Sequence, residues 1–231
     1  MSFNDLFELI KSSKNTLSKI TSWRKYDPFE DVVCSVALKN HDNELVHFNK
    51  LTEHFYAQCW SLEVESDLMW QVYRKRYEKH GGAVKLQTSL KQLIDSCSEQ
   101  NFVYLGRVKY LKKPELVGWA KNFRANIENE LMFDGGSGKA VAKQLLIKRF
   151  PYRFEREVRL LIPDYKSKEE NVFPDNYQYN IKSKDFIGKI VFDPLMDMKK
   201  FRKSKNNILE LNNELRVIRS NLYKLKNDDF Q

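Results

Sequence analysis

Two kinds of hydrophobic spacing run along the chain, and each predicts a different element. Apolar residues three or four positions apart share one face of a helix, whereas apolar residues that alternate with polar ones share one face of a strand. The first spacing predicts helices over residues 3–20, 27–38, 66–80, 89–98, 115–132, 139–148 and 206–226. The second predicts strands over residues 54–60, 83–87, 102–110, 152–162, 177–182 and 188–192.

The strand expected over residues 152–162 shows the clearest alternation. Its apolar face, interrupted by Arg156, holds Tyr152, Phe154, Val158, Leu160 and Ile162. Its charged face holds Arg153, Glu155, Glu157 and Arg159. The helix expected over residues 206–226 is also well marked. Its apolar seam covers only about three heptads, so we expect it to pack on its own domain rather than on a second copy.

Helices and strands are interspersed without a regular alternation, which favours an α+β fold over a doubly wound sheet. The chain has 231 residues, of which 42% are hydrophobic and 13% aromatic, enough to build a sizeable core. Only 8 residues are Gly and 6 are Pro, which argues against a turn-rich all-β fold. We therefore predict one domain over residues 1–231, with a mixed sheet flanked by helices and a long C-terminal helix.

Charge and cysteine content narrow the class of protein further. The formal net charge of +9 favours anionic partners, although a merely well-solvated basic surface is an equally good interpretation. No apolar run approaches the ~18 residues of a membrane span, and residues 1–11 lack the apolar stretch of a signal peptide. The three widely spaced cysteines predict a reducing compartment, so we expect a cytoplasmic protein with no membrane partner.

Two familiar kinds of site are not predicted. The stretch from Gly135 to Lys139 resembles a phosphate-binding loop, but Phe133 stands where that motif needs glycine, and Ala140 stands where it needs Ser or Thr. We therefore expect a loop before a helix at this position. The four histidines lack Cys or carboxylate neighbours at ligand spacing, so no metal site is predicted.

The charged strand face offers the most distinctive candidate chemistry. Glu155 and Glu157 lie two residues apart, which on a strand places both carboxylates on one face, about 7 Å apart. Arg153 and Arg159 flank them and would keep them ionised. Such a pair suits the orientation of a ribose hydroxyl and the stabilisation of a cationic sugar transition state. The alternative is a solvent-facing strand with ordinary cross-strand ion pairs.

A second candidate feature is the density of aromatic residues around residues 58–73. Trp60 and Ser61 end an expected strand, and Trp70 and Tyr73 lie on the helix that follows. Because a buried indole usually needs a polar partner, these residues could form the wall of a substrate pocket. The alternative is core packing where the strand meets the helix.

An ordered set of short motifs resembles the bacterial family called domain of unknown function 2971. The marks are Trp23 with Asp27-Pro28-Phe29-Glu30, Gln58-Cys59-Trp60-Ser61, Glu65-Ser66 with Met69-Trp70 and Tyr73, Gly82 to Thr88, Lys148, Phe154-Glu155 with Glu157-Val158-Arg159, Phe192-Asp193-Pro194, and Ser220 with Leu222-Tyr223. They cover about residues 20–225. The resemblance implies a small cytoplasmic α+β protein. Some family members lie among anti-phage or toxin-like genes, which implies a role in bacterial conflict.

The chain is also similar, at the level of the fold, to ADP-ribosyltransferases, which bind NAD in a split mixed sheet. That resemblance would make Ser61 the serine of the second characteristic strand and Glu157, preceded by Glu155, the glutamate of the third. The first strand of that pattern carries Arg or His. The nearest residue here is Arg24, which we expect in a loop, so this element departs from the pattern.

Together these features give a leading hypothesis and an alternative. The leading hypothesis is a conflict enzyme, ADP-ribosyltransferase-like, that acts on NAD or another nucleotide-bearing substrate. Its candidate catalytic residues are Glu157 and Glu155, and its candidate substrate-binding residues are Trp60, Ser61, Trp70, Tyr73, Lys148, Arg153 and Arg159. NAD is the one candidate cofactor. The alternative is a non-catalytic module that binds nucleic acid through the basic segment 199–205, or that binds a protein partner.

Overall fold

The computed structural model describes residues 1–25, 37–39, 45–47, 49–132 and 138–224. Its helices and mixed sheets confirm the predicted α+β fold class. The helix predicted over residues 27–38 and the Asp27–Glu30 motif lie almost wholly outside the described residues. Packing divides the chain into two compact units, where the sequence predicted one domain. Unit 1 comprises Met1–Asn15, Val64–Glu99 and Tyr179–Gln231, and unit 2 comprises Thr16–Glu63 and Gln100–Gln178.

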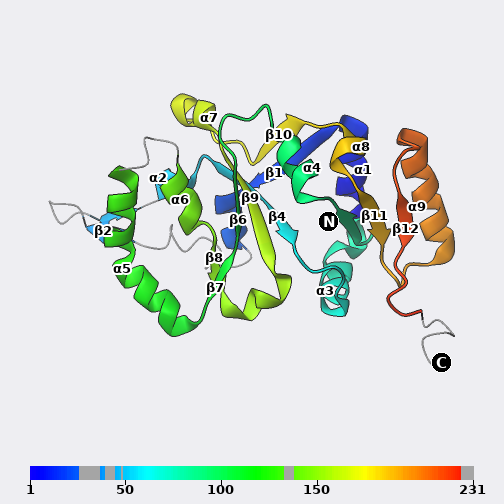
Figure 1. Cartoon of the computed structure of the whole chain (residues 1–231), viewed down its shortest axis with the longest axis horizontal. Coiled ribbons are helices and arrows are strands. Elements are labelled where there is room, and N and C mark those ends of the chain that lie inside the picture. The colour runs from blue at the N-terminus through cyan, green and yellow to red at the C-terminus, as the bar shows by residue number, and fades with distance from the viewer. Residues whose placement is uncertain (26–36, 40–44, 48, 133–137, 225–231) are drawn as a thin grey trace. The chain divides into compact units, whose positions relative to one another are not determined.

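Unit 2 is built on a five-stranded sheet with the strand order β10-β1-β4-β9-β6 (Figure 1). The strands are β1 (Lys14–Lys19), β4 (Phe55–Ser61), β6 (Tyr104–Arg107), β9 (Glu157–Pro163) and β10 (Asn176–Asn180), and the boundary with unit 1 falls inside β1 and β10. β9 pairs antiparallel with β4 on one side and with β6 on the other. Strand β9 is therefore an interior strand of this sheet.

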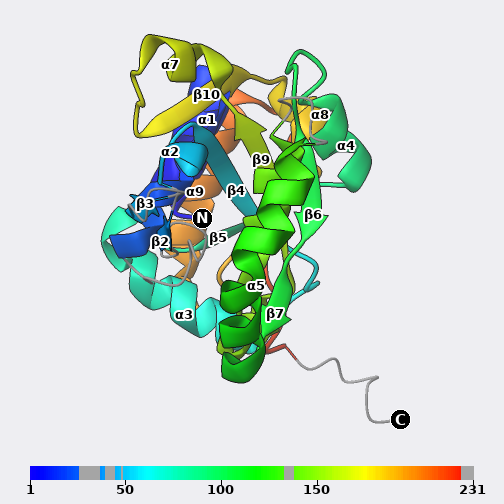
Figure 2. The ribbon, with the colours of Figure 1, turned by 90° about the vertical axis from the view of Figure 1, so that its left-hand side faces the viewer.

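The smaller elements of unit 2 surround this sheet. They are η1 (Ile20–Lys25), β2 (Ala37–Lys39), β3 (Leu45–His47), α2 (Asn49–Thr52), β7 (Lys109–Leu111), α5 (Lys113–Met132), α6 (Lys139–Gln144), β8 (Ile147–Arg149), η4 (Phe150–Glu155) and α7 (Tyr165–Glu170). Helix α5 contacts α6 and runs alongside β7 (Figure 2). Buried side chains of β4, β9 and α6, among them Phe55, Leu161 and Leu145, form the core beneath these helices.

Two sequence predictions in unit 2 need correction. The strand predicted over residues 152–162 begins only at Glu157, because Pro151 favours the 3-10 turn η4 and Arg156 then adopts a left-handed conformation with φ of 43°. The helix predicted over residues 139–148 ends at Gln144 and is followed by β8, which pairs in parallel with β7. The predicted loop before this helix is described only at Gly138, whose φ of 83° suits glycine.

His54, just before β4, makes the folded state of unit 2 sensitive to acid. Its ring is 3% exposed and packs against the rings of Phe55 and Tyr165. Burial, helped by the charge of Lys168, lowers the pKa of His54 from 6.5 to about 4. Between these values the unfolded chain binds a proton that the folded chain does not, so stability falls as pH falls.

We therefore expect His54→Phe to remove part of the acid sensitivity of the protein. Relative to wild type, the free energy of unfolding of the variant should rise by up to about 3 kcal/mol as pH falls from 6.5 to 4. Urea titrations at several pH values measure this difference. His80→Gln is the control, because His80 is exposed. A constant difference between His54→Phe and wild type across this range would contradict the prediction.

Unit 1 is built on a three-stranded mixed sheet with the order β12-β11-β5. Strand β11 pairs in parallel with β12 and antiparallel with β5. The elements are α1 (Phe3–Ser12), α3 (Asp67–Tyr77), η3 (Glu78–His80), β5 (Val84–Gln87), α4 (Leu90–Asp95), α8 (Ser183–Phe186), β11 (Lys189–Phe192), α9 (Met198–Leu211) and β12 (Val217–Arg219). Helix α9 lies beside β12 (Figure 1).

The first and last helices of the described chain have bounds that differ from the predicted ones. The first helix ends at Ser12, because Ser13 adopts a left-handed conformation and residues 14–19 form β1. The last helix spans 198–211 rather than 206–226, since Asn212 is extended and residues 217–219 form β12. The C-terminal helix itself is confirmed, and it packs on unit 1 through Ser204 and Ile208, both buried.

Candidate functional site

Unit 2 contains a network of four charged side chains at the start of β9. The ammonium nitrogen of Lys148 lies 2.7 Å from Oε2 of Glu155 and 2.9 Å from Oε2 of Glu157. The other oxygen of Glu157 accepts a hydrogen bond of 2.6 Å from Nε of Arg159. We call these four residues the charge network. The two predicted catalytic carboxylates therefore meet at one ammonium group, although Glu155 lies in η4 and not on the strand.

Neighbouring backbone and aromatic groups fix the positions of the charge network. Arg159 donates through its NH1 group to the carbonyl oxygen of Leu145 at 2.7 Å, and its guanidinium lies 5.2 Å from the ring centre of Trp23. The backbone amide of Glu157 donates to the hydroxyl of Tyr110 at 2.8 Å. Tyr110 is also the register partner of Lys148 in the parallel pair β7–β8. Residues of β7, β8 and β9 thus either belong to the charge network or contact it directly.

The two carboxylates differ in how far their side chains are buried. The side chains of Arg159 and Glu157 are 0% and 2% exposed, whereas that of Glu155 is 19% exposed. Burial alone would raise the pKa of Glu157, but the charges and hydrogen bonds of Arg159 and Lys148 outweigh it and lower this pKa to about 2. Glu157 is therefore a buried, ionised acceptor. Glu155 is the carboxylate of the network that solvent reaches.

Beside the network, cationic side chains lie over two aromatic rings of η4. The guanidinium of Arg153 is 4.4 Å from the ring centre of Phe150, and the ammonium of Lys112 is 5.5 Å from the same centre. Over the ring of Tyr152 lie Lys148, at 4.8 Å, and Arg149, at 5.5 Å. The sequence analysis missed this arrangement, although the segment 148–153, Lys-Arg-Phe-Pro-Tyr-Arg, is rich in cationic and aromatic residues.

Two further predicted site residues belong to β4, next to the network. Ser61 is the register partner of Glu157, and its hydroxyl donates to the backbone carbonyl of Glu155 at 2.6 Å. This bond ties η4 to the end of β4. The indole of Trp60 donates to the side chain of Gln58 at 3.1 Å. The structure therefore gives Ser61 a role in positioning Glu155.

The other two predicted residues, Trp70 and Tyr73, lie in unit 1. The indole nitrogen of Trp70 donates to Glu65 at 2.8 Å, and the hydroxyl of Ser220 donates to the same carboxylate oxygen at 2.5 Å. The Trp70 ring is buried, and Tyr73 packs against the same cluster. In unit 1 these contacts match the core-packing interpretation that the sequence left open.

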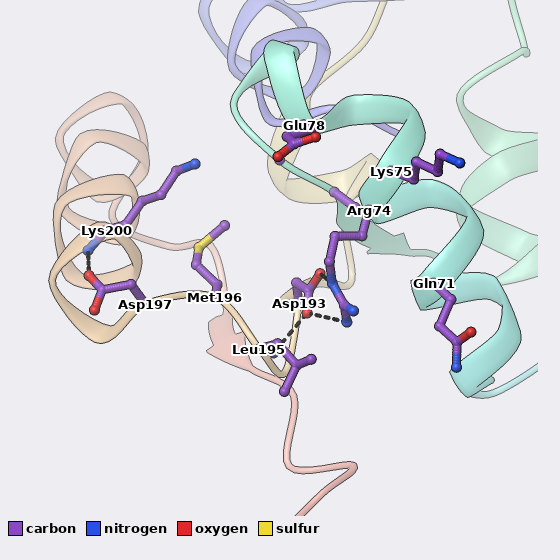
Figure 3. Close-up of a pocket in the computed structure, with 11 residues that line it drawn as sticks. Gln71, Arg74, Lys75, Glu78, Asp193, Leu195, Met196, Asp197 and Lys200 are labelled. Atoms are coloured by element: carbon purple, nitrogen blue, oxygen red, sulfur yellow. Dashed lines mark hydrogen bonds and ion pairs between the residues drawn. The ribbon is translucent and has the colours of Figure 1, made fainter.

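Unit 1 also contains an open pocket of about 370 Å³ between α3 and the start of α9 (Figure 3). Arg74 binds the buried Asp193 through two hydrogen bonds of 2.6 and 2.9 Å, and Lys200 extends from the opposite side. The charged lining residues are balanced, with Arg74, Lys75 and Lys200 against Glu78, Asp193 and Asp197. Because this pocket offers a phosphate no net positive charge, we favour the site in unit 2.

Comparison of the chain with protein-family models, curated proteins and solved structures finds no match. The resemblances to domain of unknown function 2971 and to ADP-ribosyltransferases therefore stay predictions. Among the residues that the structure describes, no three His, Cys, Asp or Glu side chains are grouped so that they could hold a metal ion. No helix in the described part of the chain is both long and apolar enough to cross a membrane.

Proposed function

We propose that the chain is an enzyme that acts on NAD or another nucleotide-bearing substrate, with Glu155 as the carboxylate that meets the substrate. The observation that carries this proposal is the contact of both carboxylates with the single ammonium of Lys148, at 2.7 and 2.9 Å. Taking charged groups such as Glu157 and Arg159 out of water is unfavourable, and buried ionisable groups with shifted pKa values gather at functional sites more often than elsewhere. The motif resemblances support the same class of substrate and a role in bacterial conflict.

The two carboxylates differ in burial and in their bound partners, and this difference supports different roles for them in the proposed reaction. Both oxygens of Glu157 are bound, one to Arg159 and one to Lys148, and its side chain is almost wholly buried. We assign Glu157 as a positioning residue that holds the ammonium of Lys148. Lys148 in turn orients Glu155, whose backbone carbonyl is fixed by Ser61. This assignment moves the catalytic role from Glu157, where the sequence analysis placed it first, to Glu155.

An ionised carboxylate at this position suits cleavage of the bond between a ribose and a base. When that bond breaks, its electron pair leaves with the base, and positive charge develops on the sugar. A fixed carboxylate stabilises this charge without reorganisation. The two carboxylates and two cations of the charge network balance one another in formal charge.

The test is turnover of a substrate panel by the purified full-length chain. NAD, ATP and other nucleotides are incubated with the protein, and released base and products are separated by chromatography. We expect turnover of one of them, and at least a 100-fold loss of rate in Glu155→Gln. Glu170→Gln, which removes an exposed carboxylate at the end of α7 in the same unit, should keep full activity. No turnover across the panel, or full activity of Glu155→Gln, would contradict the proposal.

A second candidate function, nucleic-acid binding, rests on one surface of unit 1. Lys199, Lys200, Arg202 and Lys203 are all exposed along the first turns of α9. Binding through them would weaken steeply with salt, because each phosphate contact releases bound counterions. A filter-binding titration of duplex DNA and single-stranded RNA at two salt concentrations tests this surface independently of Glu155.

A further inference from the structure

Among the side chains that the structure describes, those around η4 carry more positive than negative charge. Arg149 and Arg153 lie on the β8–η4 segment, and Lys109, Lys112 and Lys113 lie on the adjacent segment that contains β7. The acidic residues described nearby are engaged: Glu155 binds Lys148, and Glu115 accepts a hydrogen bond from the backbone amide of Lys112. The described side chains around η4 therefore have a net positive formal charge, whereas the charged residues that line the pocket of unit 1 sum to zero.

The aromatic rings of η4 hold part of this charge in place. Arg153 and Lys112 come from different segments, yet both lie over the ring of Phe150, at 4.4 and 5.5 Å from its centre. Within the described residues, neither side chain is joined to a carboxylate by an ion pair. Cation–ring contacts order long side chains before a ligand arrives, which lowers the entropy lost on binding. Phe150 is thus a ring platform that contacts two cations from different segments of the chain.

This platform lies next to the proposed reacting carboxylate. Arg153 is two residues from Glu155 on the same 3-10 turn. Tyr152 comes directly before Arg153 in the chain. Its ring is covered by Lys148, which binds Glu155, and by Arg149, which donates to the Tyr152 hydroxyl at 3.4 Å. A ligand whose sugar reached Glu155 would therefore have its charged groups close to Arg149 and Arg153.

Phosphate is the ligand chemistry that fits these groups best. Guanidinium groups bind phosphate oxygens in pairs, and lysine adds a point charge. We propose that Arg149, Arg153 and Lys112, which we call the phosphate rim, bind the phosphate groups of the nucleotide-bearing substrate. Phe150 and Tyr152 are positioning residues for these cations. The inference rests on the proposed function for the identity of the site, and it adds the group by which the substrate is recognised. Lys148 and Arg159, which the sequence analysis also assigned to substrate binding, are buried and bound to carboxylates.

The test measures binding rather than turnover. Four probes are titrated into the full-length chain by calorimetry: NAD, ATP, inorganic pyrophosphate and a ten-nucleotide single-stranded RNA. We expect wild type to bind at least one of them, Arg153→Gln and Lys112→Gln each to weaken binding about tenfold, and the double variant to weaken it further. Each removed phosphate contact should also reduce the salt dependence of binding to the RNA by about one unit of slope.

The chain offers a matched control for these variants. Lys168 is also exposed, also lies in unit 2 and also lies over a ring, that of Tyr165 at 5.7 Å, but on α7. Lys168→Gln should bind the probes like wild type. Arg153→Lys should fall between wild type and Arg153→Gln, because it keeps the charge and loses the paired donors.

The outcomes separate this inference from the proposed function. Glu155→Gln should lose turnover and keep probe binding, because the phosphate rim is intact. Binding of the RNA alone would identify a polynucleotide as the source of the phosphates, and binding of NAD or ATP would identify a free nucleotide. If no probe binds, or if Arg153→Gln and Lys112→Gln bind like wild type, the phosphate rim is wrong even where Glu155 proves essential for turnover.

Discussion

Replacement of Arg159 by Met is expected to lower the free energy of unfolding by about 3–5 kcal/mol at pH 7. Arg159 is fully buried, and its Nε lies 2.6 Å from Glu157. The variant would leave the buried carboxylate with Lys148 as its remaining cation, and it would leave the carbonyl of Leu145 without its donor. Urea denaturation followed by tryptophan fluorescence measures the loss.

The pH dependence of this loss identifies its cause. In the wild type the pKa of Glu157 is lowered from 4.5 to about 2, so its stabilising effect is present above pH 4.5 and disappears as pH falls towards 2. Arg159→Met raises that pKa. The difference from wild type should therefore be largest above pH 5 and should shrink below pH 4.5. A difference that stays constant with pH would show that lost packing, and not lost charge pairing, causes the effect.

A nearby arginine provides the control for Arg159→Met. Arg156 also pairs with a glutamate, Glu63 at 3.1 Å, but its side chain is 59% exposed. Exposed ion pairs contribute about 1 kcal/mol or less, so Arg156→Met should change stability little. In addition, Glu157→Gln combined with Arg159→Met should recover part of the loss, because the uncompensated buried charge is removed. An equal loss in Arg156→Met would mean that burial does not distinguish the two arginines.

Phe192→Ala is expected to destabilise unit 1 by about 3–5 kcal/mol. The Phe192 ring is 0% exposed on β11, and its centre lies 5.8 Å from that of Phe3 and 5.4 Å from that of Phe201. Truncation would leave a cavity between α1, β11 and α9. Hydrogen exchange of β5, β11 and β12 amides reports the loss within this unit. Phe102→Ala, at a position 40% exposed, is the control and should cost clearly less.

Local signals in the sequence predicted the start of a helix correctly where the helix has an N-cap residue of its own. Ser66 was predicted to start a helix, and its hydroxyl accepts from the amide of Met69 at the start of α3. The sequence predicted the wrong element where the same spacing of apolar residues fits both a helix and a strand. Leu17 and Ile20 continue the helical spacing of α1, yet Leu17 lies on β1, where pairing with β4 decides the structure. Residues 215–219 were assigned to the last helix for the same reason.

The candidate site shows a different limit of sequence reasoning. The alternation of Glu155, Glu157 and Arg159 marked the region where the charge network lies, but a charged face of a strand normally indicates exposure to solvent. The burial of Glu157 and Arg159 follows from groups that pack on this face of β9: the carbonyl of Leu145 and the ring of Trp23 contact Arg159, and Lys148 binds Glu157. Lys148 was selected from the family resemblance, and its contact with both carboxylates depends on the turn that Pro151 begins. The ring platforms of η4 were missed because cation–ring contacts leave no periodic signal.

The division of the chain between its two units has a consequence for synthesis on the ribosome. All residues of unit 2 have been translated once residue 178 is added, whereas unit 1 needs β11, α9 and β12 from the segment 179–231. At ordinary translation rates this segment takes roughly 3–10 s to make. During that interval α1, α3 and β5 exist without the strand that pairs with β5 and without the Phe192 and Phe201 rings beside Phe3. We therefore expect the part of the chain that carries the charge network to be completely translated before the N-terminal helix can pack against the C-terminal segment.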